Sequence, residues 1–291
     1  MYLAIKELHE KKHYAIDLLC EIAEIQRSAY YKWLRRKESR RETENRKLAD
    51  LIEAIHNDFP ELGYRRMRDV LLRTYGVHVS DNDVLRIIRI LGLQSTVKFQ
   101  RKGCTRSASD PQYVAENILN RNFHADKPNE KWLTDVTEFK YINENEIHKI
   151  YLSAILDLCD KRVVSFVIGD HNNNSLVFST FDAAVATNPD AHPLFHSDRG
   201  FQYTSRIFHQ KLVDAGMTQS MSRVGRCIDN GPMEGLWGII KREMYYGRKY
   251  HDQETLVQAL EDYLDYYNNR RYQRKLMTLT PMEFHEALLA A

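Results

Sequence analysis

The sequence predicts an α/β protein with a mixed sheet and flanking helices, preceded by small all-α units. Up to about residue 93, apolar residues recur at helical spacing and glycines interrupt them. From Lys131 onward, three strand-type runs follow one another closely, and helical and strand-type runs then alternate. This order of elements indicates a mixed sheet whose faces are covered by helices.

The charge is divided unevenly along the 291 residues. The whole chain carries 42 Lys and Arg against 40 Asp and Glu, which gives a net charge of +2. Residues 1–125 carry 23 basic and 17 acidic residues, a net +6, whereas residues 126–291 carry 19 and 23, a net −4. The total argues neither for nor against a nucleic-acid partner, but the basic first half needs an explanation.

Several classes of protein are disfavoured. No apolar run approaches the roughly 18 to 20 residues that span a bilayer, and the first residues lack the pattern of a secretion signal. The four cysteines contain no C-x-x-C pair, which argues against a disulfide framework and a cysteine zinc site. His9, His13 and Cys20 lack a second cysteine nearby, so we expect no metal there. We expect a cytoplasmic protein with reduced thiols and no membrane partner.

The first 106 residues are expected to form two helical units. Residues 1–46 are interpreted as a helical hairpin ending in a basic stretch, which is either a solvated face or a surface for a polyanion. Residues 47–106 contain glycine turns and a predicted capping box from Ser80 to Asp83, a pattern compatible with a helix-turn-helix DNA-binding domain. A plain helical bundle explains this pattern about as well. Residues 107–125 are polar and are predicted to be a linker.

The predicted α/β domain spans residues 126–291. Its strands are expected near residues 131–139, 150–156, 162–168, 192–196 and 217–221. Its helices are expected near residues 175–187 and 205–215, from about residue 233, and near 253–267. The first three strands have short connections and are therefore expected to form an antiparallel meander.

Three acidic residues lie at positions where a carboxylate does not stabilise a packed sheet. Asp135 lies inside the first predicted strand, although strand interiors disfavour Asp. Asp198 follows the fourth strand, and Glu234 lies in the first turn of a late helix. If these elements are neighbours, the three carboxylates converge into an oxygen-rich site for divalent cations. From position alone, a turn cap at Asp198 and a helix-dipole role for Glu234 are equally good explanations.

The strings around these acids are WLTDVTEF (132–139), HSDRGFQYTS (196–205) and DNGPMEGLWGIIK (229–241). They resemble the three blocks of the catalytic core of retroviral integrases and DDE transposases, above all the OrfB product of the IS-three family of bacterial insertion sequences. Between Asp135 and Asp198 lie 62 residues, and between Asp198 and Glu234 lie 35, which is the family's last interval. The strings RNFHADKPNEKW, GYRRM and YYNNRRYQRKLMTLTPMEF extend the resemblance over most of the chain.

This resemblance implies a ribonuclease-H-like core in which Asp135, Asp198 and Glu234 are catalytic and bind two Mg²⁺ ions, with Mn²⁺ as a substitute. In such a site one ion activates water or a 3′ hydroxyl, and the other stabilises the leaving oxygen during in-line attack on a DNA phosphodiester. Asp135 is expected to bridge both ions. The implied activity is that of a DDE transposase, which cleaves DNA strands at insertion-sequence ends and transfers them.

Further residues are predicted to bind DNA. Lys241 lies seven residues after Glu234 and therefore on the same helix face, where the resemblance implies a contact with the DNA end. Arg199 and Asn230 adjoin acids and are expected to orient them or to contact phosphate. Three residues of these blocks are interpreted as structural: His196, Trp132 and Trp237. The basic residues expected to contact phosphates in the helical units are Arg65, Arg66, Arg68, Arg101 and Lys102.

Two other functions stay open at this stage. One is a non-catalytic DNA-binding regulator of transposition, which the loss of an acid would have supported. The other is a hydrolytic nuclease of the same fold, which differs only in never joining strands. The resemblance also implies partners: the terminal inverted repeats of the element, target DNA, a second copy of the chain in a dimer or larger oligomer, and an upstream OrfA fusion partner. It places the protein at the bacterial nucleoid.

Overall fold

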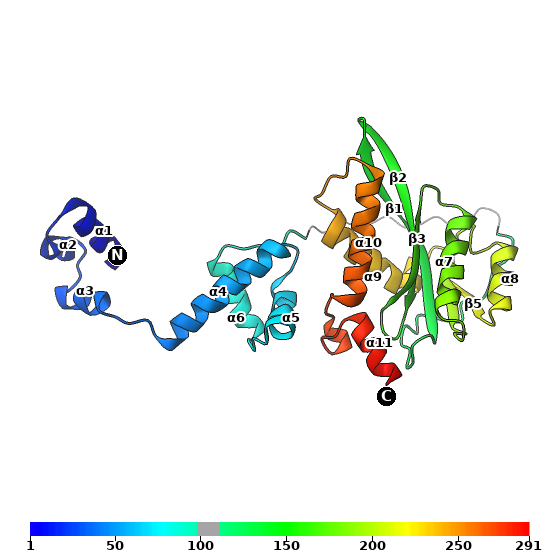
Figure 1. Cartoon of the computed structure of the whole chain (residues 1–291), viewed down its shortest axis with the longest axis horizontal. Coiled ribbons are helices and arrows are strands. Elements are labelled where there is room, and N and C mark those ends of the chain that lie inside the picture. The colour runs from blue at the N-terminus through cyan, green and yellow to red at the C-terminus, as the bar shows by residue number, and fades with distance from the viewer. Residues whose placement is uncertain (98–110, 291) are drawn as a thin grey trace. The chain divides into compact units, whose positions relative to one another are not determined.

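The structure is a computed structural model that describes residues 1–97 and 111–290 (Figure 1). The predicted DNA contacts Arg101 and Lys102 lie outside these residues. The chain divides into two compact units, Met1–Asp58 with Asn82–Leu93 and Phe59–Asp81 with Gln94–Ala291. The predicted boundaries after residues 46, 106 and 125 remain predictions. No helix of the described part is both long and apolar enough to cross a membrane.

The first unit is helical. Its helices are α1 (Tyr2–Lys12), α2 (Ile16–Ile22), α3 (Arg27–Leu34), α4 (Arg40–Asp58) and α6 (Asp81–Ile90). The basic stretch that we expected to be a solvated helix or linker contains the start of α4. This helix begins with a reciprocal cap, because Ser39 N–H donates to Glu42 Oε2 at 2.8 Å and Glu42 N–H donates to Ser39 Oγ at 3.3 Å.

The second unit contains a five-stranded mixed sheet, which confirms the predicted fold class. Its strands are β1 (Lys131–Asn143), β2 (Glu146–Asp157), β3 (Val163–Gly169), β4 (Leu194–Ser197) and β5 (Thr218–Met221). They lie in the order β3-β2-β1-β4-β5. β1, β2 and β3 pair antiparallel, as the predicted meander requires, whereas β4 pairs parallel with both β1 and β5.

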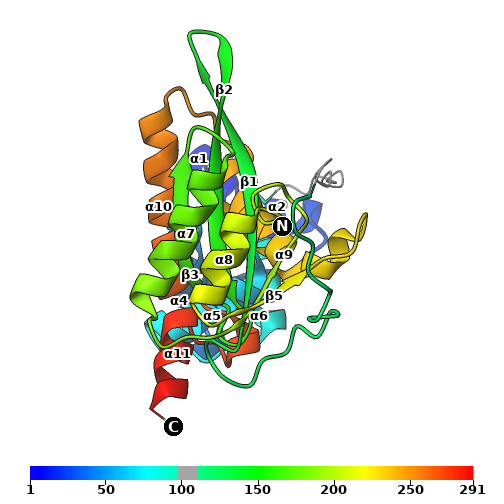
Figure 2. The same cartoon turned by 90° about the vertical axis from the view of Figure 1, so that its right-hand side faces the viewer.

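The first two strands are longer than predicted and extend beyond the others as a hairpin (Figure 2). The turn consists of Glu144 and Asn145, whose φ values of 48° and 67° are those of a tight hairpin turn. The outer half of the hairpin is polar and largely exposed, so it lacks the apolar alternation that marks the buried half. The sequence pattern therefore located only the part of each strand that faces the core.

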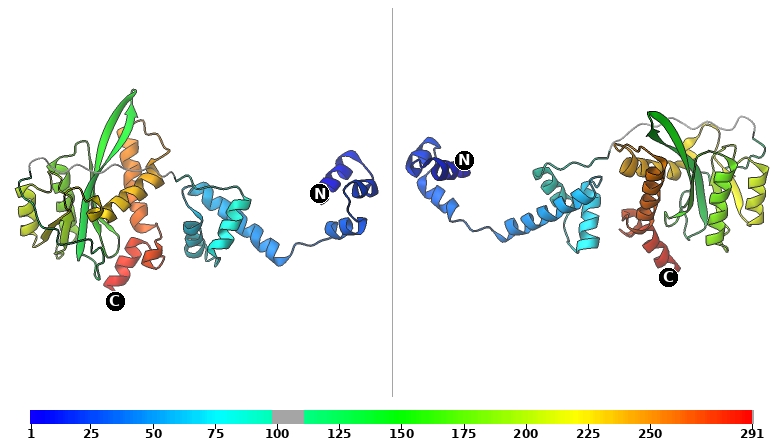
Figure 3. Two further views of the ribbon diagram at one scale, coloured as in Figure 1. Left: turned by 180° about the vertical axis from the view of Figure 1, so that it is seen from behind. Right: turned by 45° about the horizontal axis from the view of Figure 1, so that its top comes forward.

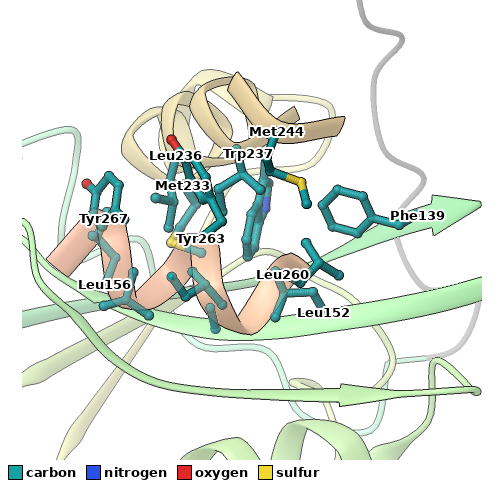
Figure 4. Close-up of a cluster of buried hydrophobic side chains, with 14 of the residues drawn as sticks. Phe139, Leu152, Leu156, Met233, Leu236, Trp237, Met244, Leu260, Tyr263 and Tyr267 are labelled. Atoms are coloured by element: carbon teal, nitrogen blue, oxygen red, sulfur yellow. The ribbon is translucent and has the colours of Figure 1, made fainter. Parts of the chain in front are cut away.

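Helices cover both faces of the sheet (Figure 3). On one face, α7 (Asn174–Thr187) and α8 (Arg206–Asp214) pack through a cluster that includes Phe181, Phe195 and Phe208. On the other, α9 (Gly231–Ile240) and α10 (Gln253–Asn269) place Trp237 and Leu260 against β1 and β2 (Figure 4). The same unit contains α5 (Tyr64–Tyr75) and α11 (Pro281–Leu289). This sandwich fixes β1, β4 and α9, the three elements that carry the predicted acids.

Candidate active site

Asp135 and Asp198 are neighbours across the parallel pair of β1 and β4. Asp135 lies opposite Ala154 on its other side, in the antiparallel pair with β2. The parallel register pairs Lys131 with Leu194, an offset of 63 residues, and 198 − 135 is also 63. Asp198, the residue after β4, therefore continues this register beside Asp135. The first and fourth strands are therefore neighbours, which is the condition that the sequence analysis set for the convergence of these two acids.

Glu234 lies in the first turn of α9, as the sequence indicated. The helix starts with Gly231 and Pro232, and its apolar residues Met233 and Leu236 are buried toward the sheet, while the Glu234 side chain is exposed. Within the described residues, no three His, Cys, Asp or Glu side chains form a group that could hold a metal ion. The structure thus brings two acids together and leaves the third near them on an exposed helix turn.

The surroundings of Asp135 and Asp198 disfavour the charged forms of both carboxyl groups. Burial, the neighbouring Asp198 and, more weakly, Glu234 raise the pKa of Asp135 to about 7, against hydrogen bonds from Trp237 and the Val136 N–H that lower it. Burial also raises the pKa of Asp198, although its Oδ1 accepts the Gly200 N–H at 2.8 Å. A bound cation would remove this penalty, because its charge offsets both the desolvation and the repulsion.

Glycine at position 200 favours this close approach. A Cβ at this position would lie 3.0 Å from Asp198 Oδ1 and 3.0 Å from Gln202 Oε1. The missing side chain therefore lets the Gly200 N–H reach the Asp198 carboxylate and hold it at the end of β4.

Trp237 orients the first acid. Its indole N–H donates to Asp135 Oδ2 at 2.9 Å, while the ring is buried among the residues between α9 and the sheet (Figure 4). Trp237 follows Glu234 by three residues, so one helix carries an acid and the donor that holds another acid. We interpreted Trp237 as structural from the sequence, and its bond to Asp135 adds a role at the site.

A fourth acid, Asp229, anchors the start of α9. It lies in η1 (Cys227–Asn230) and its side chain is fully buried. Arg223 donates to both of its oxygens, from Nε to Oδ2 at 2.8 Å and from Nη2 to Oδ1 at 2.9 Å. Arg121 Nε donates to Oδ1 at 2.6 Å, and Asn117 Nδ2 to Oδ2 at 3.0 Å. These bonds, led by those from Arg223, hold the pKa of Asp229 far below its usual range.

Asn230, the next residue, ties the same turn to the sheet. Its Nδ2 donates to the Thr134 carbonyl at 3.1 Å, one residue before Asp135. The side chain is buried, and its Oδ1 has no hydrogen-bond partner in the structure. Asn230, which we predicted to orient an acid or to contact phosphate, is therefore held against β1. A phosphate contact by Asn230 remains a prediction.

The other predicted residues of the core lie around the site. Lys241 begins η2 (Lys241–Tyr245), and its ammonium lies 5.0 Å from the centre of the Phe139 ring on β1. Arg199 Nε donates to the Ser222 carbonyl at 2.8 Å. His196 is buried between the hydroxyls of Ser220 and Ser222, and burial lowers its pKa to about 4. A neutral imidazole with a hydrogen bond at each ring nitrogen agrees with a structural role for His196.

The predicted phosphate contacts of α5 already have partners in the protein. Arg66 lies 2.6 Å from Glu243 and donates to the Tyr266 hydroxyl at 3.0 Å. Arg68 lies 3.0 Å from Asp69, and the Arg65 guanidinium lies over the Tyr64 ring. DNA binding by Arg65, Arg66 and Arg68 remains a prediction, but DNA would have to compete with these contacts, above all at Arg66.

The sequence reasoning missed Asp229, Arg121 and Arg223. Asp229 stands in the same string as Glu234 and could have been noticed as an acid directly before a helix. Arg121 belongs to the segment predicted to be a linker, and no local pattern links it to a residue 108 positions later. Only the tertiary structure brings these three side chains together.

Comparisons with known proteins agree with this arrangement. Residues 125–227 and 234–289 match two families described as integrase core domain, and residues 43–102 match an HTH-like domain. These three matches leave residues 1–42 outside. The HTLV-2 integrase catalytic core domain, solved in complex with magnesium, is 20% identical with a TM-score of 0.44, over 56% of this chain and 99% of that chain.

Curated relatives cover nearly the whole chain. A protein named as the transposase InsK of insertion sequence element IS150 from Escherichia coli (strain K12) is 35% identical, over 96% of this chain and 97% of that protein. A transposase-like protein of Haemophilus influenzae is 36% identical, over 72% of this chain and 94% of its own length. The sheet, its acids and these matches define an integrase-type core. The chain belongs to the IS-three family of insertion-sequence transposases, OrfB type.

Proposed function

We propose that this chain is a DNA transposase that cuts strands at the ends of an insertion sequence and joins them to target DNA, using Asp135, Asp198 and Glu234 with divalent metal. The observation that carries the proposal is the pair formed by Asp135 on β1 and Asp198 directly after the neighbouring parallel strand β4. Their mutual repulsion and burial raise the pKa of Asp135 to about 7. Perturbed carboxylates placed side by side at a strand end are typical of functional sites.

The residues present fit Mg²⁺ or Mn²⁺. Both ions prefer carboxylate oxygens, and Asp135 and Asp198 supply them side by side, where burial and acidic neighbours disfavour their charge. We propose that the exposed Glu234 side chain joins the two aspartates in holding two ions. Bound there, the metal would supply Lewis-acid stabilisation of an attacking and a leaving oxygen at a DNA phosphodiester.

The protein's own contribution is to hold these groups in place. Trp237 fixes one oxygen of Asp135, and the Gly200 N–H fixes one oxygen of Asp198. Asp229 and Asn230 set the start of α9 and hence the position of Glu234. We propose that Lys241 and Arg199 contact the DNA backbone beside the acids. Fixed ligands need no reorganisation when the reaction begins, which lowers its barrier.

Several partners belong to this proposal. The DNA ligands are the terminal inverted repeats of the element and a target duplex. Because two ends must be joined to one target, we propose a dimer or larger oligomer on DNA, and fusion to an upstream OrfA product as the active form. The protein would then act at the nucleoid.

The test uses labelled duplexes made from the DNA that flanks this gene, with Mg²⁺ or Mn²⁺. The intact chain is compared with Asp135→Asn. We expect metal-dependent nicking at a terminal repeat and a joined product with the intact chain, and neither with Asp135→Asn. DNA binding should persist in the variant, because the amide removes a metal ligand and no basic residue.

Asp182→Asn is the matched control. Asp182 is an exposed acid on α7 that pairs with Lys211, and its loss should leave both products unchanged. Nicking without joining would assign the chain to hydrolytic nucleases. Binding without either product, also when OrfA is supplied, would assign it to regulators. Cleavage by Asp135→Asn at the wild-type rate would overturn the catalytic assignment.

A further inference from the structure

The first three helices form a small bundle with its own core. Ile5 of α1, Leu19 and Cys20 of α2 and Tyr30 of α3 are buried together. Trp33 adds to it by stacking on Tyr2, with ring centres 5.5 Å apart. The bundle lies within residues 1–42, outside the matched families, so nothing in those matches assigns it a role.

The connection between α2 and α3 is that of a helix-turn-helix. Four residues, 23–26, separate the end of α2 at Ile22 from the start of α3 at Arg27. Glu24 has φ of 53°, the left-handed conformation that such turns need and that usually selects Gly. Two short helices joined by a turn of three or four residues, with a common core, are the unit that places its second helix in the major groove of DNA.

The two sides of α3 differ as this use requires. Tyr30 is 1% exposed, and Trp33 packs on Tyr2, so this side faces the core. Ser28 and Lys32, four residues apart, are exposed on the other side, and Arg35 follows at the end of the helix. The exposed face therefore carries a hydroxyl near its amino-terminal end and two cations further along.

These cations are available to a ligand. Lys32 and Arg35 make no ion pair with any residue that the structure describes, whereas Arg27 is paired with Asp17 at 3.0 Å. On α1, by contrast, Lys6 and Lys11 each lie in an i,i+4 pair with a glutamate. Unpaired positive charge on an exposed helix of this motif complements the phosphates that border a DNA groove.

We propose that α2 and α3 form a second helix-turn-helix, separate from residues 43–102, that binds duplex DNA through the face of α3 carrying Ser28, Lys32 and Arg35. Lys32 and Arg35 contact phosphates, and Ser28 faces base edges. The inference rests on the proposed function only in taking duplex DNA as the ligand. An acidic protein partner is the competing occupant, but a helix-turn-helix with a polar first turn on its second helix fits a groove better than a flat acidic surface.

The test measures duplex binding by the full chain at several salt concentrations, without metal. Lys32→Ala/Arg35→Ala is compared with Lys6→Ala/Lys11→Ala, which removes the same charge from α1. We expect the α3 variant to weaken binding about tenfold or more and to lower the slope of log affinity against log salt by about 2. The α1 variant should stay near the wild type. Ser28→Ala should reduce the preference for element ends over unrelated duplexes.

Lys32→Arg/Arg35→Lys keeps both charges and should retain wild-type affinity, which separates lost contacts from lost folding. Equal binding by the two alanine variants would overturn this inference, and so would weak binding by the charge-conserving variant. A wild-type chain that binds no duplex at all would instead overturn the proposed function. If the wild type binds and nicks DNA while the alanine variants bind equally well, only the second helix-turn-helix is wrong.

Discussion

The second unit contains two groups of carboxylates with opposite electrostatics, Asp229 on the one hand and the pair of Asp135 and Asp198 on the other. Asp229 is fully buried, yet its pKa lies far below the usual range because Arg223 and Arg121 donate to it. Asp135 is partly exposed, yet its pKa is raised to about 7, first by desolvation and then by its acidic neighbours Asp198 and Glu234. Burial alone therefore does not separate the two.

This electrostatic difference separates an acid that stabilises the fold from acids that are candidates for binding a ligand. Asp229 has its cations built into the protein, so its charge stabilises the folded state. Within residues 1–97 and 111–290, the hydrogen-bond donors to Asp135 and Asp198 are the neutral groups of Trp237, Val136 and Gly200, so the charge of these acids opposes folding until a cation binds. An acid whose partners are all neutral or acidic is a better candidate for metal binding than one that is merely buried.

The largest effect should come from Asp229→Asn. The amide replaces one buried acceptor oxygen by a donor and removes the counter-charge of Arg223 and Arg121, whose side chains are partly exposed. We expect these losses to lower the free energy of unfolding by about 3 kcal/mol. Since the folded pKa of Asp229 is depressed, its stabilisation is present above the unfolded pKa of about 4 and is lost as pH falls below that. Urea unfolding of both proteins at pH 8 measures the loss, and repeating it between about pH 4 and about pH 2 shows whether the difference disappears.

Asp265→Asn is the control for this first prediction. Asp265 pairs with Arg270 on the surface, where both side chains are more than half exposed, and its loss should cost less than about 0.5 kcal/mol. Equal losses for Asp229→Asn and Asp265→Asn would show that the buried cluster does not anchor α9.

Mg²⁺ should stabilise the wild type by a comparable amount. At one hundred times the dissociation constant, a ligand that binds only the folded state adds about 2.7 kcal/mol. Thermal unfolding with and without Mg²⁺ measures the gain, and chelation should reverse it. Asp198→Asn should lose the upward shift, because it removes a proposed ligand. Asp229→Asn keeps Asp135 and Asp198 in place and should retain part of the shift, reduced by the displacement of Glu234 at the start of α9. A shift that survives in Asp198→Asn would place the metal elsewhere.

The sequence predicted the fold class, and it singled out the three candidate acids, because both depend on strong local signals. Asp135 inside an apolar strand is unusual wherever the strand lies, and the buried halves of β1 and β2 alternate clearly. The exposed hairpin end formed by Glu144 and Asn145 has no such signal, so the predicted strands stopped early.

Long-range contacts limited the prediction of the site in a different way. Arg121 and Trp237 lie in stretches of sequence that carry no unusual signal. Their hydrogen-bond partners are decided by the packing of α9 against β1. The arginines of α5 show the same limit, because a basic string predicts a polyanion while Arg66 has Glu243 as its partner. Residue type indicates what a side chain can bind, and the tertiary structure decides which partner is near.

Asp198→Asn should make the metal-free protein more stable. The amide keeps an oxygen for the Gly200 N–H and removes the repulsion on Asp135, so we expect a gain of about 1 to 2 kcal/mol at pH 8. Because the folded pKa of Asp135 is raised to about 7, the wild type loses stability as pH rises from about 4 to 7, and the gain should shrink toward pH 5. Chemical unfolding of both proteins in chelator, at pH 5 and pH 8, tests the sign.

Trp237→Phe should have the most specific effect on metal use. Phenylalanine keeps an aromatic ring between α9 and the sheet but removes the N–H that holds Asp135 Oδ2. Loss of such a ligand-orienting bond should raise the Mg²⁺ concentration for half-maximal nicking about tenfold, with little change at saturating metal. Trp132→Phe is the matched control, because its indole N–H donates to Asp157 and Asn129 instead of a predicted ligand. If both variants shift the Mg²⁺ requirement equally, Trp237 contributes only to packing. The difference between Asp229 and the pair of Asp135 and Asp198 would then depend on neighbouring charges and not on the hydrogen bond from Trp237.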